Sequence, residues 1–220
     1  MPVRAGVTRS PDPGIAQVVL PPEAGRGGRW AEELPFRDLG SSVEIDASAL
    51  TFAEPLFAAR LAACIDFHSE RGATIEVIPP GRREVANYLS RLGLHRHLSS
   101  NCVFPLREVA ARDRRDVLIP LTRLRSRHDI EPLAEELLAL LQAQLGKGSE
   151  AIDPLVSGLG ELASNAAEHG SSPFGVYLSP GFRSCWASGG GFLGLGPVFV
   201  GFLVVAASFG VGTRLVLLWG

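Results

Sequence analysis

The chain has 220 residues, with 21 Lys and Arg against 23 Asp and Glu, which leaves a formal net charge of -2. This length suits one large or two small domains, and the near-neutral balance gives no global reason to expect a nucleic-acid partner. Cys64, Cys102 and Cys185 lie too far apart for a disulfide framework or a zinc pattern, which favours a reducing cytoplasm. No apolar segment follows Arg4 and Arg9, so we expect no secretory signal.

The N-terminal segment, residues 1–40, is rich in Pro and Gly at its start, and we predict that most of it is flexible. It contains one short apolar run, Ile15 to Leu20, which we predict to be an edge strand. From residue 41 onward the hydrophobic pattern becomes regular, and this change marks the expected start of the first folded domain.

Residues 41–100 alternate between strand and helix patterns. Val43 to Ile45 and Thr74 to Ile78 are β-branched runs that predict strands. Phe52 to Arg71 and Glu84 to Leu92 carry apolar residues at helical spacing, and glycines follow both. The inward residues of the first predicted helix are Phe57, Leu61, Cys64 and Ile65, and those of the second are Val85, Leu89 and Leu92. This order implies parallel strands with right-handed crossovers, and therefore a small α/β domain.

The same segment carries three short patterns of one family. Its first strand ends in Ile-Asp-Ala-Ser, Leu-Thr-Phe follows, and Leu-Ser-Arg-Leu-Gly-Leu closes it. Together these patterns resemble a STAS domain, the fold of anti-sigma factor antagonists. Such antagonists carry a phosphorylated serine at the helix start, where this chain has Glu54, Pro55 and Leu56. The resemblance therefore implies a docking surface or an intramolecular regulator without a phosphorylation switch, and we expect Ser48 and Thr51 to cap the helix.

Residues 101–116 are polar and arginine-rich, and we predict that they form the linker between two domains. Acidic residues interleave with the arginines, and aromatic residues that could stack on bases are nearly absent. We therefore expect no nucleic-acid binding.

The second predicted domain, residues 117–178, contains the strongest chemical signal in the chain. Its strand candidates are Val117 to Leu121 and Phe174 to Leu178, and Ile130 to Leu145 is an amphipathic helix with leucines along one side. A further helix follows, for which Asp153 and Pro154 suit the N-cap and first helical positions and Gly170 suits the C-terminal cap.

Glu161 and Asn165 are four residues apart, so both side chains project from the same face of that helix. A carboxylate one turn before a carboxamide suits a magnesium nucleotide site, because the amide oxygen is a hard ligand and the acid can orient or deprotonate a nucleophile. The same spacing also occurs on ordinary solvated helix faces, and these two residues alone leave both interpretations open.

The full decapeptide from Glu161 to Gly170 reads Glu-Leu-Ala-Ser-Asn-Ala-Ala-Glu-His-Gly. It resembles the N box of the GHKL ATPase superfamily, and in particular that of the serine kinases that act as anti-sigma factors. This resemblance implies that Glu161 is the general base and Asn165 the magnesium ligand. It also implies that Asn165, His169 and Gly170 belong to an ATP site.

Residues 179–220 form a tail of different character, with no acidic residue and many Gly, Phe, Val and Leu residues. GHKL ATPases continue with an Asp-x-Gly-x-Gly box that binds adenine, but this chain has no Asp after Asp153. Binding of ATP and magnesium is therefore conditional on the tail completing the site. Three alternatives stay open for the tail: a membrane helix over Phe192 to Phe209, buried strands at Val198 to Val205 and Leu215 to Leu218, or a frameshifted or truncated end, which the abrupt change favours.

Taken together, the sequence predicts an α/β protein in which a STAS-like domain precedes the N-terminal part of a GHKL-type α/β sandwich. The expected function is that of an ATP-binding regulatory protein, impaired by the missing adenine box and, if active, a magnesium-dependent serine/threonine kinase or ATPase. The alternative is a non-enzymatic docking module. We expect a regulatory protein such as a sigma factor or an anti-sigma factor antagonist as the partner, homodimerisation stays open, and membrane contact through the tail is not favoured.

Overall fold

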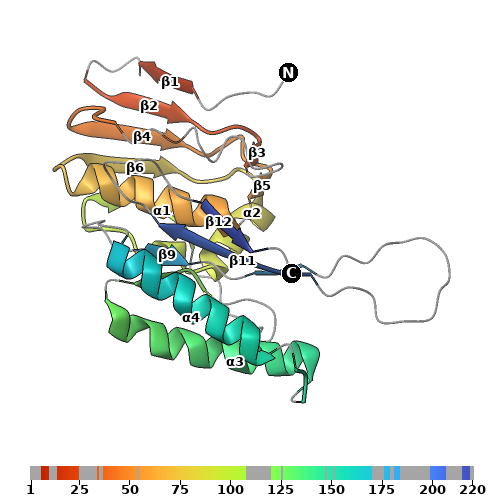
Figure 1. Cartoon of the computed structure of the whole chain (residues 1–220). Helices are drawn as coiled ribbons and strands as arrows, with labels where there is room; N and C mark the ends of the chain where they lie inside the picture. The colour runs from red at the N-terminus through yellow and green to blue at the C-terminus, as the bar shows by residue number, and fades with distance from the viewer. Residues whose placement is uncertain are drawn as a thin grey trace.

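The computed structural model describes residues 6–9, 14–24, 34, 37–53, 55–107, 120–124, 126–146, 148–150, 152–169, 176–178, 181–183, 199–206 and 215–218. The described elements stack in layers (Figure 1): a first sheet, helix α1 beneath it, a second sheet, and the helices α4 and α3 on the far side. Below, the first half means the described residues up to 107, and the second half means those from 120 onward. The layered arrangement of helices on sheets confirms the α/β class.

The first sheet has the strand order β1-β2-β4-β6-β7. Its strands are β1 (Gly6–Arg9), β2 (Ala16–Val19), β4 (Ser42–Asp46), β6 (Thr74–Ile78) and β7 (Cys102–Val103), and a separate short pair joins β3 (Glu23–Ala24) to β5 (Phe52–Ala53). The strands β2, β4, β6 and β7 pair in parallel, and β1 pairs antiparallel to β2. In β6 the buried Ile75 and Val77 alternate with exposed Thr74 and Glu76, as expected for a strand with one face on the core. The predicted parallel pairing is confirmed.

Two sequence predictions about the edges of this sheet need correction. The run from Ile15 to Leu20 does form a strand, but β2 is interior because β1 covers its outer side. At the other edge, β7 lies inside the segment that we expected to be a linker, so the first sheet continues to Val103. A two-residue strand is too short to leave a periodic signal, which explains why the pattern did not reveal it.

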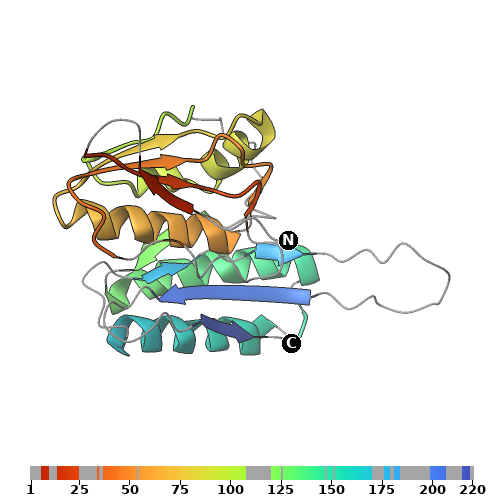
Figure 2. The same cartoon turned by 90° about the horizontal axis from the view of Figure 1, so that it is seen from above.

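Helix α1 (Pro55–Ser69) is buried on all sides from Phe57 onward. Every residue from Phe57 to Ser69 is buried, although the sequence predicted one apolar stripe only. The cause is that α1 contacts β6 of the first sheet and also β9 and β11 of the second sheet, so β11 lies between α1 and α4 (Figures 1 and 2). By helical spacing, Ala59, Ala62 and Ala63 share a stripe with Asp66, and their small side chains allow the second sheet to approach.

Helix α2 (Arg83–Arg91) follows its prediction closely, and Val85, Leu89 and Leu92 are buried as expected. Gly93 ends it with a φ of 75°, a left-handed conformation that favours glycine, and the short η2 (Leu94–Arg96) follows. Helix α1 begins at Pro55, so Ser48 and Thr51 lie seven and four residues before its start and the prediction that they cap it is wrong. Thr51 Oγ1 donates a hydrogen bond to the Pro22 carbonyl (2.8 Å), which ties β5 to β3, and Ser48 donates its backbone N–H to Asp46.

The second half begins with β8 (Thr122–Leu124) and η3 (Arg127–Asp129), then α3 (Ile130–Leu145) and α4 (Ile152–His169). The strands β9 (Val176–Leu178), β10 (Gly181–Arg183), β11 (Phe199–Ala206) and β12 (Leu215–Leu218) complete an antiparallel sheet of order β10-β11-β9-β8, to which β12 adds beside β11. Helix α3 has the predicted bounds. Helix α4 begins before Asp153, so this residue lies in the first turn and not at the N-cap. The strand predicted at Val117 to Leu121 is not present at residues 120–121, residues 117–119 lie outside the described residues, and a strand that was not predicted, β8, follows at Thr122–Leu124.

The described residues of the tail, 181–183, 199–206 and 215–218, form strands. Residues 199–206 form β11 and residues 215–218 form β12, which confirms strands at both predicted places. Among the described residues, no helix combines the length and the apolar character needed to cross a lipid bilayer. The prediction of a helix over Phe192 to Phe209 is therefore wrong at residues 199–206, and the frameshift alternative stays a prediction.

The hydrophobic core does not stop at the expected domain boundary. The larger cluster of buried residues is built on the first sheet and α1, but it includes Leu121 and Tyr177 of the second half. A smaller cluster lies between α3, α4 and the end of β8, with Leu124, Leu137 and Ala163 among its members. The two halves thus share one packed interface.

Candidate nucleotide site

The face of α4 that carries the N-box residues points away from the core. Leu159 and Ala163 are buried in the smaller cluster, whereas Glu161 and Asn165 are exposed. An amphipathic helix that packs one stripe on its neighbour leaves the opposite stripe to solvent. The helix therefore presents the carboxylate and the carboxamide one turn apart, as the spacing predicted.

Glu161 and Asn165 line one pocket of about 770 Å³. The other lining residues are Gly160 and Ser164 of α4, and Arg127, His128, Ile130 and Glu131 of η3 and α3. Because α3 and α4 are consecutive packed helices joined by a short turn, the start of α3 lies opposite the end of α4. This volume is in the range of small-ligand sites.

A local hydrogen-bond pair shapes the wall formed by η3. The Ser126 backbone N–H donates to Asp129 Oδ2 (2.8 Å), and the Asp129 backbone N–H donates to the Ser126 carbonyl (3.2 Å). These bonds close the turn that holds Arg127 and His128 at the pocket. A basic guanidinium and an imidazole therefore share the pocket with the carboxylates of Glu131 and Glu161.

The donor set suits magnesium that arrives with a nucleotide better than magnesium held by the protein alone. Within the described residues, no group of three or more His, Cys, Asp or Glu side chains could hold a metal ion. Mg²⁺ commonly uses one or two protein oxygens and takes its remaining ligands from phosphates and water. Asn165 and Glu161 fit that limited role.

The structure brings together two of the four predicted site residues. Glu161 and Asn165 line the pocket, whereas the His169 side chain and Gly170 lie outside what the structure describes. Sequence reasoning missed Arg127, His128 and Glu131. The predicted succession of two helices could have indicated them, since a helical hairpin places the first turn of one helix near the last turns of the next.

A second polar cluster lies between the two halves, and we call it the junction: Asp66, His97, Arg123, Tyr177 and the Leu121 carbonyl. Asp66 is only 2% exposed and lies on α1. Arg123 Nη1 lies 3.0 Å from Asp66 Oδ2, and the Tyr177 hydroxyl donates a hydrogen bond to the same oxygen. Arg123 and Tyr177 are directly opposite each other in the β8–β9 pair. The buried carboxylate thus receives a cation and a donor from two adjacent strands.

His97 completes the junction from the first half. Its Nε2 donates a hydrogen bond to the Leu121 carbonyl, which can only accept. Its ring packs edge to face on the Tyr177 ring, with the ring centroids 6.2 Å apart. Burial is the main cause that lowers the pKa of His97 below 6.5, because it disfavours the charged imidazolium. Burial, with a smaller contribution from Asp66, raises the pKa of Cys102 to about 12. The junction is therefore a low-dielectric environment in which the Asp66 carboxylate pairs with the Arg123 guanidinium.

No protein-family model, curated protein or solved structure matches this chain. The functional assignment therefore depends on the chain's own residues and geometry. The feature that carries it is the pocket at Glu161 and Asn165.

Proposed function

We propose that the chain binds magnesium ATP in the pocket lined by Glu161 and Asn165, as a regulatory ATPase-like protein of the GHKL type. The observation that carries this proposal is that both residues, one turn apart on α4, line the same pocket of about 770 Å³. Opposite the pair, the wall carries the guanidinium of Arg127 and the imidazole of His128 beside the carboxylate of Glu131. The resemblance of the decapeptide to an N box gives the pocket its suggested ligand.

The residues divide the expected chemistry between them. Asn165 offers its amide oxygen as one hard ligand, and Glu161 can accept the proton of an attacking serine hydroxyl or water. Magnesium, when bound with the nucleotide, neutralises phosphate charge that the carboxylates of Glu131 and Glu161 would otherwise repel. Arg127 can pair with phosphate oxygens through two parallel hydrogen bonds, and His128 adds a further donor.

We propose weak base selectivity for this site. The chain has no Asp after Asp153, so the family's acceptor for the adenine amino group is missing. Sites that lack a hydrogen bond to a distinguishing group reject analogues only weakly. Phosphate contacts would therefore supply most of the affinity. The group that accepts the phosphoryl group would be a protein serine or water, in a cytoplasmic regulatory pathway.

Calorimetric titration with magnesium and a non-hydrolysable ATP analogue tests the site. We expect magnesium-dependent binding in the wild type and at least about a tenfold loss of affinity in Asn165→Ala, a change of roughly 1.4 kcal/mol. Asn87→Ala is the matched control, because Asn87 lies on α2 outside the pocket. Equal affinity of wild type and Asn165→Ala would reject the proposed site.

The same titration with a GTP analogue tests the proposed base selectivity. We expect affinities for the two analogues within about tenfold of each other, since only a site with a dedicated acceptor discriminates by much more. A preference for adenine beyond about a hundredfold would mean that the chain contains another acceptor for its amino group.

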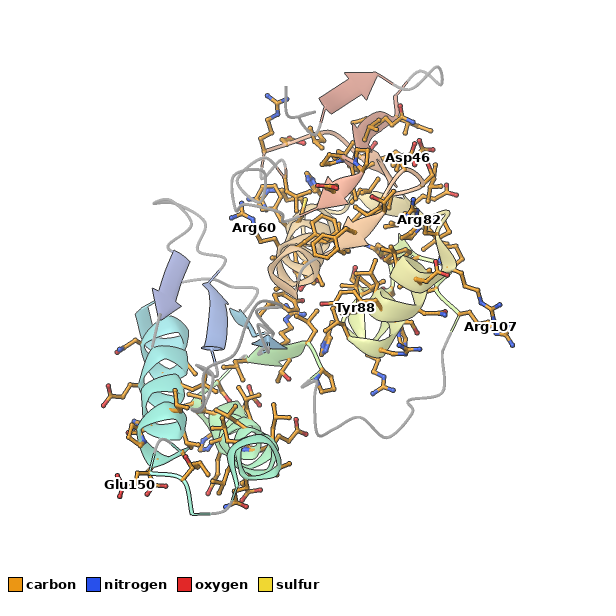
Figure 3. All side chains as sticks on the ribbon, turned by 90° about the vertical axis from the view of Figure 1, so that its right-hand side faces the viewer. Asp46, Arg60, Arg82, Tyr88, Arg107 and Glu150 are labelled. Carbon is orange, nitrogen blue, oxygen red and sulfur yellow. The ribbon has the colours of Figure 1, made fainter. Side chains whose placement is uncertain are left out.

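The second candidate function is a docking module that holds no nucleotide. The missing aspartate favours it, and so does the surface around α2, where Arg82, Arg83, Arg91 and Arg107 are exposed. Arg82 and Arg107 both lie beside α2 (Figure 3). If folded protein binds neither analogue, this surface becomes the first region to probe with a regulatory partner.

A further inference from the structure

Strand β8 connects the junction to the pocket over very few residues. Leu121 and Arg123 take part in the junction, and Leu124 is fully buried in the smaller core cluster. Arg127 and His128, which follow almost at once, line the pocket. One short segment therefore contacts the first half at its start and forms a pocket wall at its end.

Leu121, which directly precedes β8, and Arg123 of β8 both bond to the first half. The Leu121 backbone N–H donates to the Leu92 carbonyl at the end of α2 (2.8 Å), and the Leu121 carbonyl accepts from His97. Arg123 then pairs with Asp66 of α1 at 3.0 Å. Because Asp66 is almost fully buried, a shift of β8 would take the Arg123 guanidinium away from a buried carboxylate, which is costly in a protein interior.

The two pocket walls are anchored differently. Gly160, Glu161, Ser164 and Asn165 belong to the long helix α4, which packs on α3, β9 and β11. The opposite wall, residues 127–131, consists of η3 and the first turn of α3. It contacts α4 itself, and it also follows β8 closely in the chain, through the turn at Ser126. The position of β8 is therefore one of two constraints on the width of the pocket.

We propose that Asp66 is a positioning residue for the pocket: through Arg123 it fixes β8, and β8 fixes the wall at residues 127–131 against α4. The first half would thereby control ligand affinity in the second half without contacting the ligand. The affinity part of this inference rests on the proposed nucleotide site, whereas the part concerning the wall does not. A coupling of this kind is reciprocal, so ligand binding would also strengthen the junction.

Two variants that keep the size of the side chain test the inference. Tyr177→Phe removes only the hydroxyl that donates to Asp66, and Asp66→Asn removes the charge while keeping the side-chain size. The chain has two tyrosines, so Tyr88→Phe on α2 is the matched control for loss of a phenolic hydroxyl. For each protein, hydrogen exchange is followed in peptides covering residues 121–137 and 74–92, and the affinity for the magnesium-bound ATP analogue is measured.

In both junction variants, but not in Tyr88→Phe, we expect exchange to become faster at residues 121–137 by a larger factor than at residues 74–92. We also expect an affinity loss of about fivefold or more, within the usual range of coupling between sites. A merely structural role would speed exchange in both peptides alike, and that result would overturn the proposal, as would unchanged exchange in both.

The readouts separate this proposal from the proposed function. If the wild type binds no analogue but exchange at residues 121–137 still rises selectively, the positioning role of Asp66 stands and the nucleotide site is rejected. If the analogue binds and Asp66→Asn changes neither exchange nor affinity, the nucleotide site stands and the positioning role is overturned.

Discussion

Helices α1 and α3 have nearly the same length, 15 and 16 residues, yet they occupy different environments. Helix α3 packs one side on α4 and the second sheet, and its exposed side carries Glu131, Glu135 and Glu136. Helix α1 is covered by a sheet on each side, so its polar residues Arg60, Asp66 and His68 are buried. Burial of α1, and with it the stability of the first half, therefore depends on the second sheet.

The largest expected loss of stability comes from changing a buried polar residue of α1, Asp66. Asp66→Ala leaves Arg123 without its carboxylate and should reduce the free energy of unfolding by about 4 kcal/mol. Urea denaturation followed by circular dichroism measures the loss. Replacing both partners, as Asp66→Leu with Arg123→Met, should recover most of it, because the uncompensated charge disappears. A cost below about 1 kcal/mol for the single variant would mean that the pair behaves like a solvated surface pair.

Core truncation in each half tests whether the halves unfold together. Leu61 of α1 and Leu137 of α3 are both fully buried, so Leu61→Ala and Leu137→Ala should each cost about 3 kcal/mol. Since the larger core cluster spans both halves, we expect both variants to lower the midpoint of a single thermal transition. Two separate transitions, each sensitive to one variant only, would contradict a shared core.

The pH dependence of stability probes the junction itself. The folded state holds the pKa of His97 below 6.5, so below about pH 6.5 the unfolded chain binds a proton that the folded chain does not. Stability is therefore fully present above that pH and falls as the pH decreases, by up to about 1.4 kcal/mol per pH unit. His97→Asn keeps a donor for the Leu121 carbonyl and should remove this component. Identical pH profiles of the two proteins would exclude His97 as its source.

The smallest expected effects concern two glycines, one in each half. Gly93 has a φ of 75°, so Gly93→Ala should cost about 1 kcal/mol. Gly158 lies inside α4 with open space around an added Cβ, so Gly158→Ala should gain about 0.5 to 1 kcal/mol through helix propensity. Thermal unfolding of the two variants and the wild type measures both changes in stability. A loss of stability in Gly158→Ala would indicate close packing there in the folded protein.

The sequence predicted best what depends on local pattern. Strand β6, helix α3 and the burial of Val85 and Leu89 all follow from spacing within a few residues. The pocket pair Glu161 and Asn165 was likewise visible in one helical turn. The junction was not, because nothing near Asp66 in sequence indicates that Arg123 and Tyr177 lie against it. Long-range pairing between antiparallel strands decides that contact, and local periodicity contains no information about it.

The contact between Asp66 and Tyr177 spans 111 residues of chain. At about 5 to 20 residues per second of translation, roughly 5 to 20 seconds therefore pass between synthesis of the helix that carries Asp66 and synthesis of the strand that covers it. During that interval the alanine stripe of α1 has no sheet against it and presents an apolar surface with a carboxylate at its edge. A chain that ended before Tyr177 would lack β9 and β11, and that surface of α1 would stay uncovered.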